Sequence, residues 1–120
     1  MDDHEKAGKI AAEVLVFGKK LIKEGAVLGD VSNKVEEKIK KLKGEIAFPC
    51  QISINEVAAH YCPDFNDMTV IKKGDLVKLD LGVHVKGKIA DTACSIDVGG
   101  DKNLELIKAS KDALKEATDL

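Results

Sequence analysis

The sequence contains one long alternation of apolar and polar residues, which runs from Leu76 to Val98 and is interrupted at Lys86-Gly87. Alternation with a period of two is typical of a β-strand that buries one face, and a two-residue break containing glycine favours a hairpin turn. The pattern therefore predicts two antiparallel strands joined at Lys86-Gly87. The apolar face, which has to pack on the rest of the chain, consists of Val77, Leu79, Leu81, Val83 and Val85 opposite Ala90, Cys94, Ile96 and Val98.

The segments on either side of this hairpin carry other periods. Apolar residues spaced three and four apart predict helices over residues 3–24, 30–43 and 104–118. A short alternating strand is expected over 51–55, and a second short apolar stretch follows at 57–61. The order of helices, strands, hairpin and helix predicts an α+β fold with an antiparallel sheet, built as a single domain of 120 residues.

The predicted helices have recognisable end signals. Short polar side chains cap helix starts, and glycine is favoured in the left-handed position that ends a helix. The candidates are Asp2 or Asp3 and Gly25 for the first helix, Gly44 for the end of the second, and Asp101 and Asn103 for the start of the third.

Composition restricts the classes of partner. All 19 basic residues are lysine and the net charge is −2, so neither arginine forks nor a strong positive field is available for nucleic acid. No apolar run is long enough to cross a membrane, and the acidic start at Asp2 and Asp3 does not resemble a secretory signal. We therefore expect a cytoplasmic protein without membrane or nucleic-acid partners.

Three cysteines are present, at Cys50, Cys62 and Cys94, without a CxxC pair. An odd number of cysteines is typical of reduced thiols in a cytosolic protein. We expect all three to be small buried hydrophobic residues, with Cys50 and Cys62 as soft metal ligands the alternative.

Two aspartates lie on the polar face of the predicted hairpin. With the turn at Lys86-Gly87, Asp80 is opposite Ala93 and Asp91 is opposite Gly82. Asp80 and Asp91 then project from the same face as diagonal neighbours, with Cα atoms about 7–8 Å apart. Because Ala93 and Gly82 have almost no side chain, the space between the two carboxylates should be open.

Two interpretations of this face are available. Half-solvated antiparallel sheets are common, so the face could simply meet water. Alternatively, two convergent carboxylates could hold one or two divalent cations. A two-metal hydrolytic centre needs further acidic or imidazole ligands, and the pattern of residues alone does not decide between these interpretations.

Several short motifs occur in a recognisable order over about fifty residues. They are Phe48-Pro49, Ser53-Ile54-Asn55-Glu56, Ala58-Ala59-His60-Tyr61, Gly74-Asp75, Leu79-Asp80-Leu81-Gly82 and Ile89-Ala90-Asp91-Thr92-Ala93. With them, the sequence resembles the N-terminal part of the methionine aminopeptidases, which belong to the pita-bread metallopeptidases. Tyr61 after His60 resembles the type II branch of archaea and eukaryotes. The resemblance implies the N-terminal half of a pita-bread fold, with the sheet packed against helices.

The resemblance also implies roles for four residues. Asp80 would chelate one divalent metal ion and Asp91 would bridge two, with cobalt, manganese, iron or zinc as the metal. His60 would line the substrate site and contact the substrate near the scissile peptide bond, and Phe48 would help wall the pocket for the methionine side chain. The implied reaction removes the initiator methionine of nascent polypeptides.

The other metal ligands of that family, one histidine and two glutamates, come from beyond Leu120. The resemblance therefore implies an N-terminal fragment that is inactive alone, binds metal weakly or not at all, and self-associates as a homodimer. Lys88 departs from the family, which often has an aromatic residue there, but it can reach solvent beside the turn.

Other readings of the same residues stay open. The chain could be a non-catalytic pita-bread relative that acts as a binding module, or a prolidase or aminopeptidase P type of peptidase, which shares the paired aspartates. Without the resemblance, His60 would be a hydrogen-bonded core histidine, Phe48 an ordinary core residue and His84 an exposed strand residue.

Overall fold

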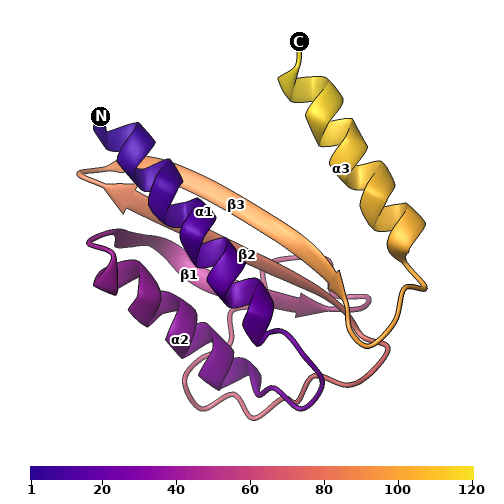
Figure 1. Ribbon diagram of the computed structural model, residues 1–120. Helices are drawn as coiled ribbons and strands as arrows, with labels where there is room; N and C mark the ends of the chain where they lie inside the picture. The colour runs from indigo at the N-terminus through magenta and orange to yellow at the C-terminus, as the bar shows by residue number, and fades with distance from the viewer.

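The computed structural model describes residues 1–120 as three helices and three strands. In chain order these are α1 (Asp3–Leu21), α2 (Leu28–Lys41), β1 (Glu45–Ile54), β2 (Leu76–Val85), β3 (Lys88–Asp97) and α3 (Leu104–Thr118). The strands form one antiparallel sheet in the order β1-β2-β3. As Figure 1 shows, α1 crosses β2 and β3, α2 lies along β1, and α3 stands apart beyond β3. The predicted α+β class with an antiparallel sheet is confirmed.

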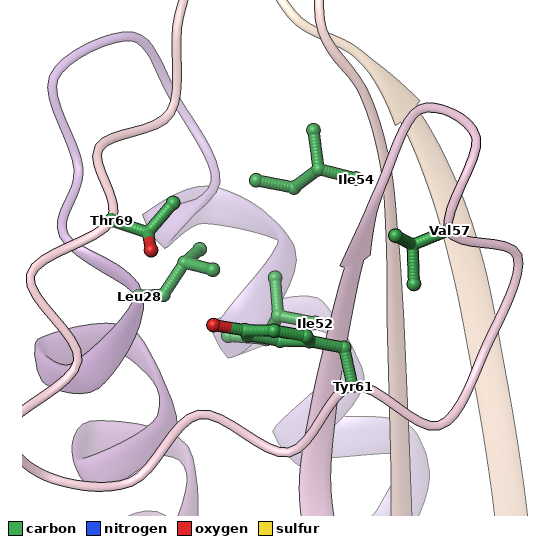
Figure 2. Close-up of a pocket in the computed structure, with 6 residues that line it drawn as sticks. All are labelled: Leu28, Ile52, Ile54, Val57, Tyr61 and Thr69. Atoms are coloured by element: carbon green, nitrogen blue, oxygen red, sulfur yellow. The ribbon is translucent and has the colours of Figure 1, made fainter.

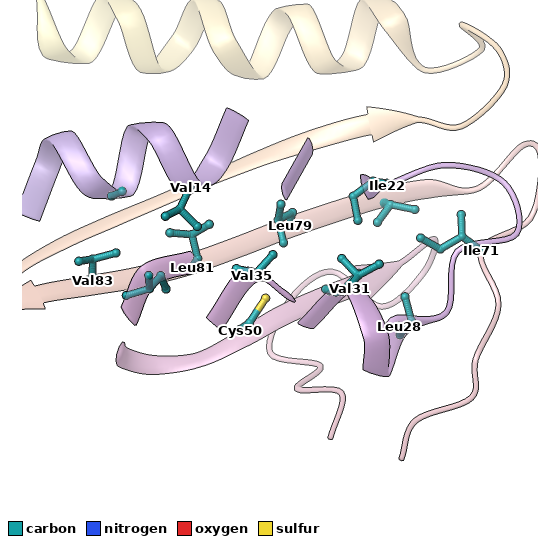
Figure 3. Close-up of a cluster of buried hydrophobic side chains, with 14 of the residues drawn as sticks. Val14, Ile22, Leu28, Val31, Val35, Cys50, Ile71, Leu79, Leu81 and Val83 are labelled. Atoms are coloured by element: carbon teal, nitrogen blue, oxygen red, sulfur yellow. The ribbon is translucent and has the colours of Figure 1, made fainter. Parts of the chain in front are cut away.

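The apolar face of the hairpin forms the centre of the core. Val77, Leu79, Leu81 and Val83 are all 0% exposed, as the alternation predicted. Figure 3 shows Leu79, Leu81 and Val83 meeting side chains from α1 and α2. Helix α1 approaches closely because it presents small residues, and a Cβ on Gly18 would lie only 2.8 Å from Cδ2 of Leu79.

Helix α1 begins as predicted but ends earlier. Oδ1 of Asp2 accepts a hydrogen bond from the Glu5 amide at 2.8 Å, which confirms the cap. The predicted end at residue 24 is wrong, because the helix stops at Leu21 and Ile22 turns its buried side chain into the core. Gly25 has a φ of +89° but lies in the following turn rather than at the end of the helix.

Helix α2 differs from the prediction at both ends. It starts at Leu28 and not Asp30, because carbonyl oxygens of the 67–69 segment accept from the amides of Leu28 and Gly29 and replace a side-chain cap. At its other end Lys43, with a φ of 73°, takes the left-handed position expected for Gly44. Gly44 is instead needed for packing, since a Cβ there would lie 2.8 Å from Val83.

Strand β1 is longer than the predicted 51–55. It starts at Glu45, and its register with β2 shifts between Ile46 and Phe48 and again between Phe48 and Gln51. These irregularities interrupt the alternation, so only the second half of the strand was visible in the sequence. The stretch 57–61 forms no strand, although the Ile52 amide donates to the Tyr61 carbonyl at 2.9 Å.

The predicted hairpin is confirmed in bounds, turn and register. Lys86 and Gly87 have φ angles of 51° and 83°, and two positive φ values are the signature of the type I′ turn that suits tight hairpins. Asp80 is paired with Ala93 and Gly82 with Asp91, as expected. Lys88 is exposed beside the turn.

Helix α3 has the predicted bounds but does not pack as a core helix. None of its residues is buried, and Leu104 and Leu114 are 58% and 67% exposed. The expected side-chain cap is absent: Asn103 instead donates through its backbone and side-chain nitrogens to the two carboxylate oxygens of Asp97, at 2.8 and 2.9 Å.

The cysteines differ from one another in burial. Cys50 is buried, and this burial raises the pKa of its thiol to about 12. Cys94 is half-buried, whereas Cys62 is exposed, so the expectation of three buried cysteines is wrong for Cys62. It lies in the irregular segment after β1, where little packs over it. None of the three helices is both long and apolar enough to cross a membrane.

Leu79 and Val16 provide a test of this core. Leu79→Ala should lower the free energy of unfolding by about 2–5 kcal/mol, because it leaves a cavity between the sheet and the helices. Val16→Ala, at a position of α1 that is 58% exposed, should change it by no more than about 0.5 kcal/mol. Urea denaturation measures both, and equal losses in the two variants would contradict this assignment of the core.

Candidate metal centre

The two aspartates lie where the predicted register put them. Asp80 is in the middle of β2, where it is paired with Ala93 of β3. Asp91 is two residues before Ala93 in β3, so its side chain projects from the same face as that of Asp80. This face is the one opposite α1 and α2, because the alternate residues Leu79 and Leu81 are in the core. The hairpin therefore presents both carboxylates on the sheet face that the two helices leave free.

The pKa of Asp80 reflects both its burial and the neighbouring carboxyl group of Asp91. Burial raises the pKa of Asp80 above its usual range, and the charge of Asp91 and a hydrogen bond between the two carboxyl groups raise it further. His60 acts in the opposite direction and lowers it. In addition, Oδ1 of Asp80 is buried without a hydrogen-bond partner. Two carboxylates that repel each other fit a divalent cation, whose positive charge would relieve the repulsion.

Phe48 covers part of the space beside these aspartates. It is paired with Gly82 across β1 and β2, and a Cβ on Gly82 would overlap its ring. The expectation that this space is open is therefore wrong above Gly82, where the half-buried ring of Phe48 lies beside Asp91. This contact could not be predicted from the sequence, because the register shifts in β1 hide the face on which Phe48 lies.

His60 is held near Asp80 by the segment that follows β1. The backbone of this segment is left-handed at Asn55 and at His60, with φ angles of 54° and 71°. Nζ of Lys78 donates to the Asn55 carbonyl at 2.7 Å, and the Tyr61 amide donates to Oγ of Ser53 at 3.3 Å. The segment is thus fastened to the sheet on both sides of His60, whose side chain is exposed.

Tyr61 anchors the same segment on the helix side of the sheet. Figure 2 shows its ring extending from the loop across Ile52 and toward Leu28, over an apolar cavity of about 180 Å³. The hydroxyl donates to Asp67, and this hydrogen bond raises the pKa of Tyr61 and lowers that of Asp67. Neighbouring residues of the loop therefore serve different purposes: Tyr61 fixes the chain, and His60 remains available.

The structure brings together the four residues singled out in the sequence, Phe48, His60, Asp80 and Asp91. Lys78 and Ser53 were not predicted as part of the site, although the alternation places Lys78 on the same face as Asp80. His84 is an ordinary strand residue, whose Nδ1 accepts from the Gly87 amide at 3.1 Å. No group of three or more histidine, cysteine, aspartate or glutamate side chains is placed to hold a metal ion.

Comparison with known proteins agrees with this geometry. The chain belongs to metallopeptidase family M24, which it matches over residues 2–120. It is 51% identical over 120 residues to the methionine aminopeptidase of the archaeon Thermococcus kodakarensis, covering 98% of this chain and 40% of that relative. The type II branch inferred from Tyr61 is consistent with an archaeal relative. The chain thus spans about two fifths of the length of these curated relatives.

Solved structures show the same fold. The crystal structure of methionine aminopeptidase from Thermotoga maritima superposes with a TM-score of 0.85 at 32% identity, covering 93% of this chain and 48% of that chain. The prolidase from Pyrococcus horikoshii superposes with a TM-score of 0.79 at 31% identity, covering 94% of this chain and 33% of that chain. The fold is therefore about half of the pita-bread fold, as expected.

The raised pKa of Asp80 predicts a pH dependence of stability. Because the folded state favours the neutral carboxyl group, its contribution is greatest below the ordinary aspartate pKa of about 4 and is lost as pH rises through the folded pKa. In buffer with EDTA, wild type should therefore lose stability relative to Asp80→Asn over this interval. Urea denaturation from about pH 3 to about pH 8 measures the difference. Asp101→Asn, at an exposed position, is the control, and parallel curves for wild type and Asp80→Asn would contradict the prediction.

Proposed function

We propose that this chain supplies the two-aspartate part of the metal centre of a methionine aminopeptidase, which removes the initiator methionine of nascent polypeptides. The observation that carries the proposal is the pair Asp80 and Asp91, which the register of the hairpin puts on one sheet face. Burial and the charge of Asp91 both raise the pKa of Asp80. The similarity to methionine aminopeptidases over nearly the whole chain supports it. Nascent chains are made in the cytoplasm, which is where this activity would act.

Asp80 and Asp91 would hold two divalent ions, with Asp80 chelating one and Asp91 bridging both. Cobalt, manganese, iron and zinc all accept carboxylate oxygen together with imidazole. When bound, such ions supply Lewis acidity at the scissile peptide bond. Because two carboxylates offer few donor atoms, we expect these 120 residues alone to bind metal weakly and to be inactive.

The neighbouring residues would bind the substrate. His60 is exposed and close enough to Asp80 to affect its pKa, so its imidazole can contact a peptide bond that lies at the metals. Phe48 is half-buried, and its ring covers Gly82, the residue paired with Asp91. It would form an apolar wall for the methionine side chain. A flexible thioether packs well against an aromatic ring, which suits this pairing.

A chimera tests the activity. The matching segment of the Thermococcus kodakarensis methionine aminopeptidase would be replaced by this chain, which is 51% identical to it. The chimera should release methionine from Met-Ala-Ser, and Asp80→Asn or Asp91→Asn should abolish this. Loss of a residue that only hydrogen-bonds a metal ligand typically lowers metal affinity or activity by about 10–100-fold. Loss of a ligand itself should therefore lower kcat/KM by more than about 100-fold.

Asp101→Asn is the matched charge control, because Asp101 is exposed and lies outside the strands that carry Asp80 and Asp91. It should leave kcat/KM unchanged. The similarity to a prolidase structure makes a dipeptidase the alternative, so the chimera is also assayed on Ala-Pro. Cleavage of Ala-Pro in preference to Met-Ala-Ser, or full activity of Asp80→Asn, would contradict the proposal.

We also propose that the chain self-associates as a homodimer. Helix α3 exposes Leu104, Leu106 and Leu114, and β3 lies at the edge of the sheet with one side of its backbone unpaired. Exposed apolar patches and free strand edges both favour association, and a second copy would offer the same surface in return.

Sedimentation velocity at micromolar concentration should show a dimer. Leu106→Lys combined with Leu114→Lys should return the chain to a monomer, because a charge replaces the apolar contact. Val16→Lys is the control, since Val16 is 58% exposed but lies on α1. A wild-type monomer would contradict the proposed dimer.

A further inference from the structure

Two buried polar side-chain atoms of the protein lack a hydrogen-bond partner, and they belong to neighbouring residues. They are Oε1 of Gln51 and Oδ1 of Asp80. Gln51 in β1 is paired directly with Asp80 in β2. Directly opposed residues of an antiparallel pair project from the same face, with Cβ atoms about 4.5–5.5 Å apart.

Two oxygens in this arrangement cannot satisfy each other, because both only accept hydrogen bonds. A buried acceptor without a donor is costly, and this cost is greater for a carboxylate than for a neutral group. The Gln51 side chain contains the missing donor. Rotation of its amide by half a turn about the last bond exchanges Oε1 and Nε2 within the same volume, which turns an N–H group into the buried position.

We propose that Gln51 is a positioning residue for the metal centre, whose Nε2–H group donates to Oδ1 of Asp80. The hydrogen bond fixes the plane of the Asp80 carboxylate and leaves Oδ2 to face a cation. Gln51 acts through Asp80 and is not itself a ligand. The inference rests on the proposed function to the extent that Asp80 binds metal.

This role explains why position 51 has an amide side chain, which supplies a hydrogen-bond donor to Asp80. Partners of ligating carboxylates orient the ligand before the metal arrives, and their loss typically lowers metal affinity by about 10–100-fold. An apolar residue at position 51 would fill the same space, but it would leave Oδ1 of Asp80 unpaired and the carboxylate free to rotate away from Asp91.

The first test is made on the metal-free chain by NMR. The side-chain amide protons of Gln51 should exchange slowly with solvent, and this protection should disappear in Asp80→Leu, which has no acceptor. Free exchange of these protons in the wild-type chain would overturn the hydrogen bond. This measurement needs no variant at Gln51, so it holds even if such a variant fails to fold.

The second test is a Mn²⁺ titration of the 120-residue chain, followed by the EPR signal of the free ion. Gln51→Met keeps the length of the side chain without a donor and should weaken binding by about tenfold. Gln51→Asn keeps an amide and should retain more affinity than Gln51→Met. Ser95→Ala, on the same sheet face opposite Lys78, is the control and should bind like wild type.

Asp80→Asn separates the two proposals. If Asp80→Asn abolishes Mn²⁺ binding while Gln51→Met binds like wild type, the positioning role is overturned and the metal centre stands. If Asp80→Asn binds as well as wild type, the metal centre itself is overturned, and the role of Gln51 toward a metal falls with it. Slow amide exchange together with weaker binding by Gln51→Met supports the positioning role.

Discussion

The structure depends on the burial of one face of the β2–β3 hairpin. Val77, Leu79, Leu81 and Val83 are wholly buried, and α1 is placed by its contacts with this face, whereas α2 packs on β1 and on α1. A register slip of one residue would turn these side chains to the other face, so burial and the turn at Lys86-Gly87 together fix the register. The same constraint fixes the candidate metal centre, because it puts the side chains of Asp80 and Asp91 on the opposite face of the sheet.

Elements with an uninterrupted period could be predicted from the sequence. This applies to the hairpin and its register, to the bounds of α3, and to the strand partners of the two aspartates. The motifs around His60 and Asp80 then identified the family, and membership of metallopeptidase family M24 confirms it. Burial of one face imposes a regular pattern, and a regular pattern can be read without knowing the tertiary contacts.

The features that escaped prediction depend on contacts between distant segments. Helix α2 needs no side-chain cap because carbonyls some forty residues later meet its first amides, and no local signal reports this. Register shifts in β1 hid both the length of that strand and the position of Phe48 over Gly82. The role proposed for Gln51 was not predicted for the same reason, since it depends on Asp80, the residue paired with it across the sheet.

Helix α3 is tied to the sheet at one point, where Asp97 accepts two hydrogen bonds from Asn103. Helix α3 is already formed beyond this point, so its exposed leucines lie on a folded helix before any partner binds. Association with such a helix does not have to fold a disordered segment, so less conformational entropy is lost on binding. The contact between Asp97 and Asn103 would then determine where a partner bound to α3 lies relative to the sheet.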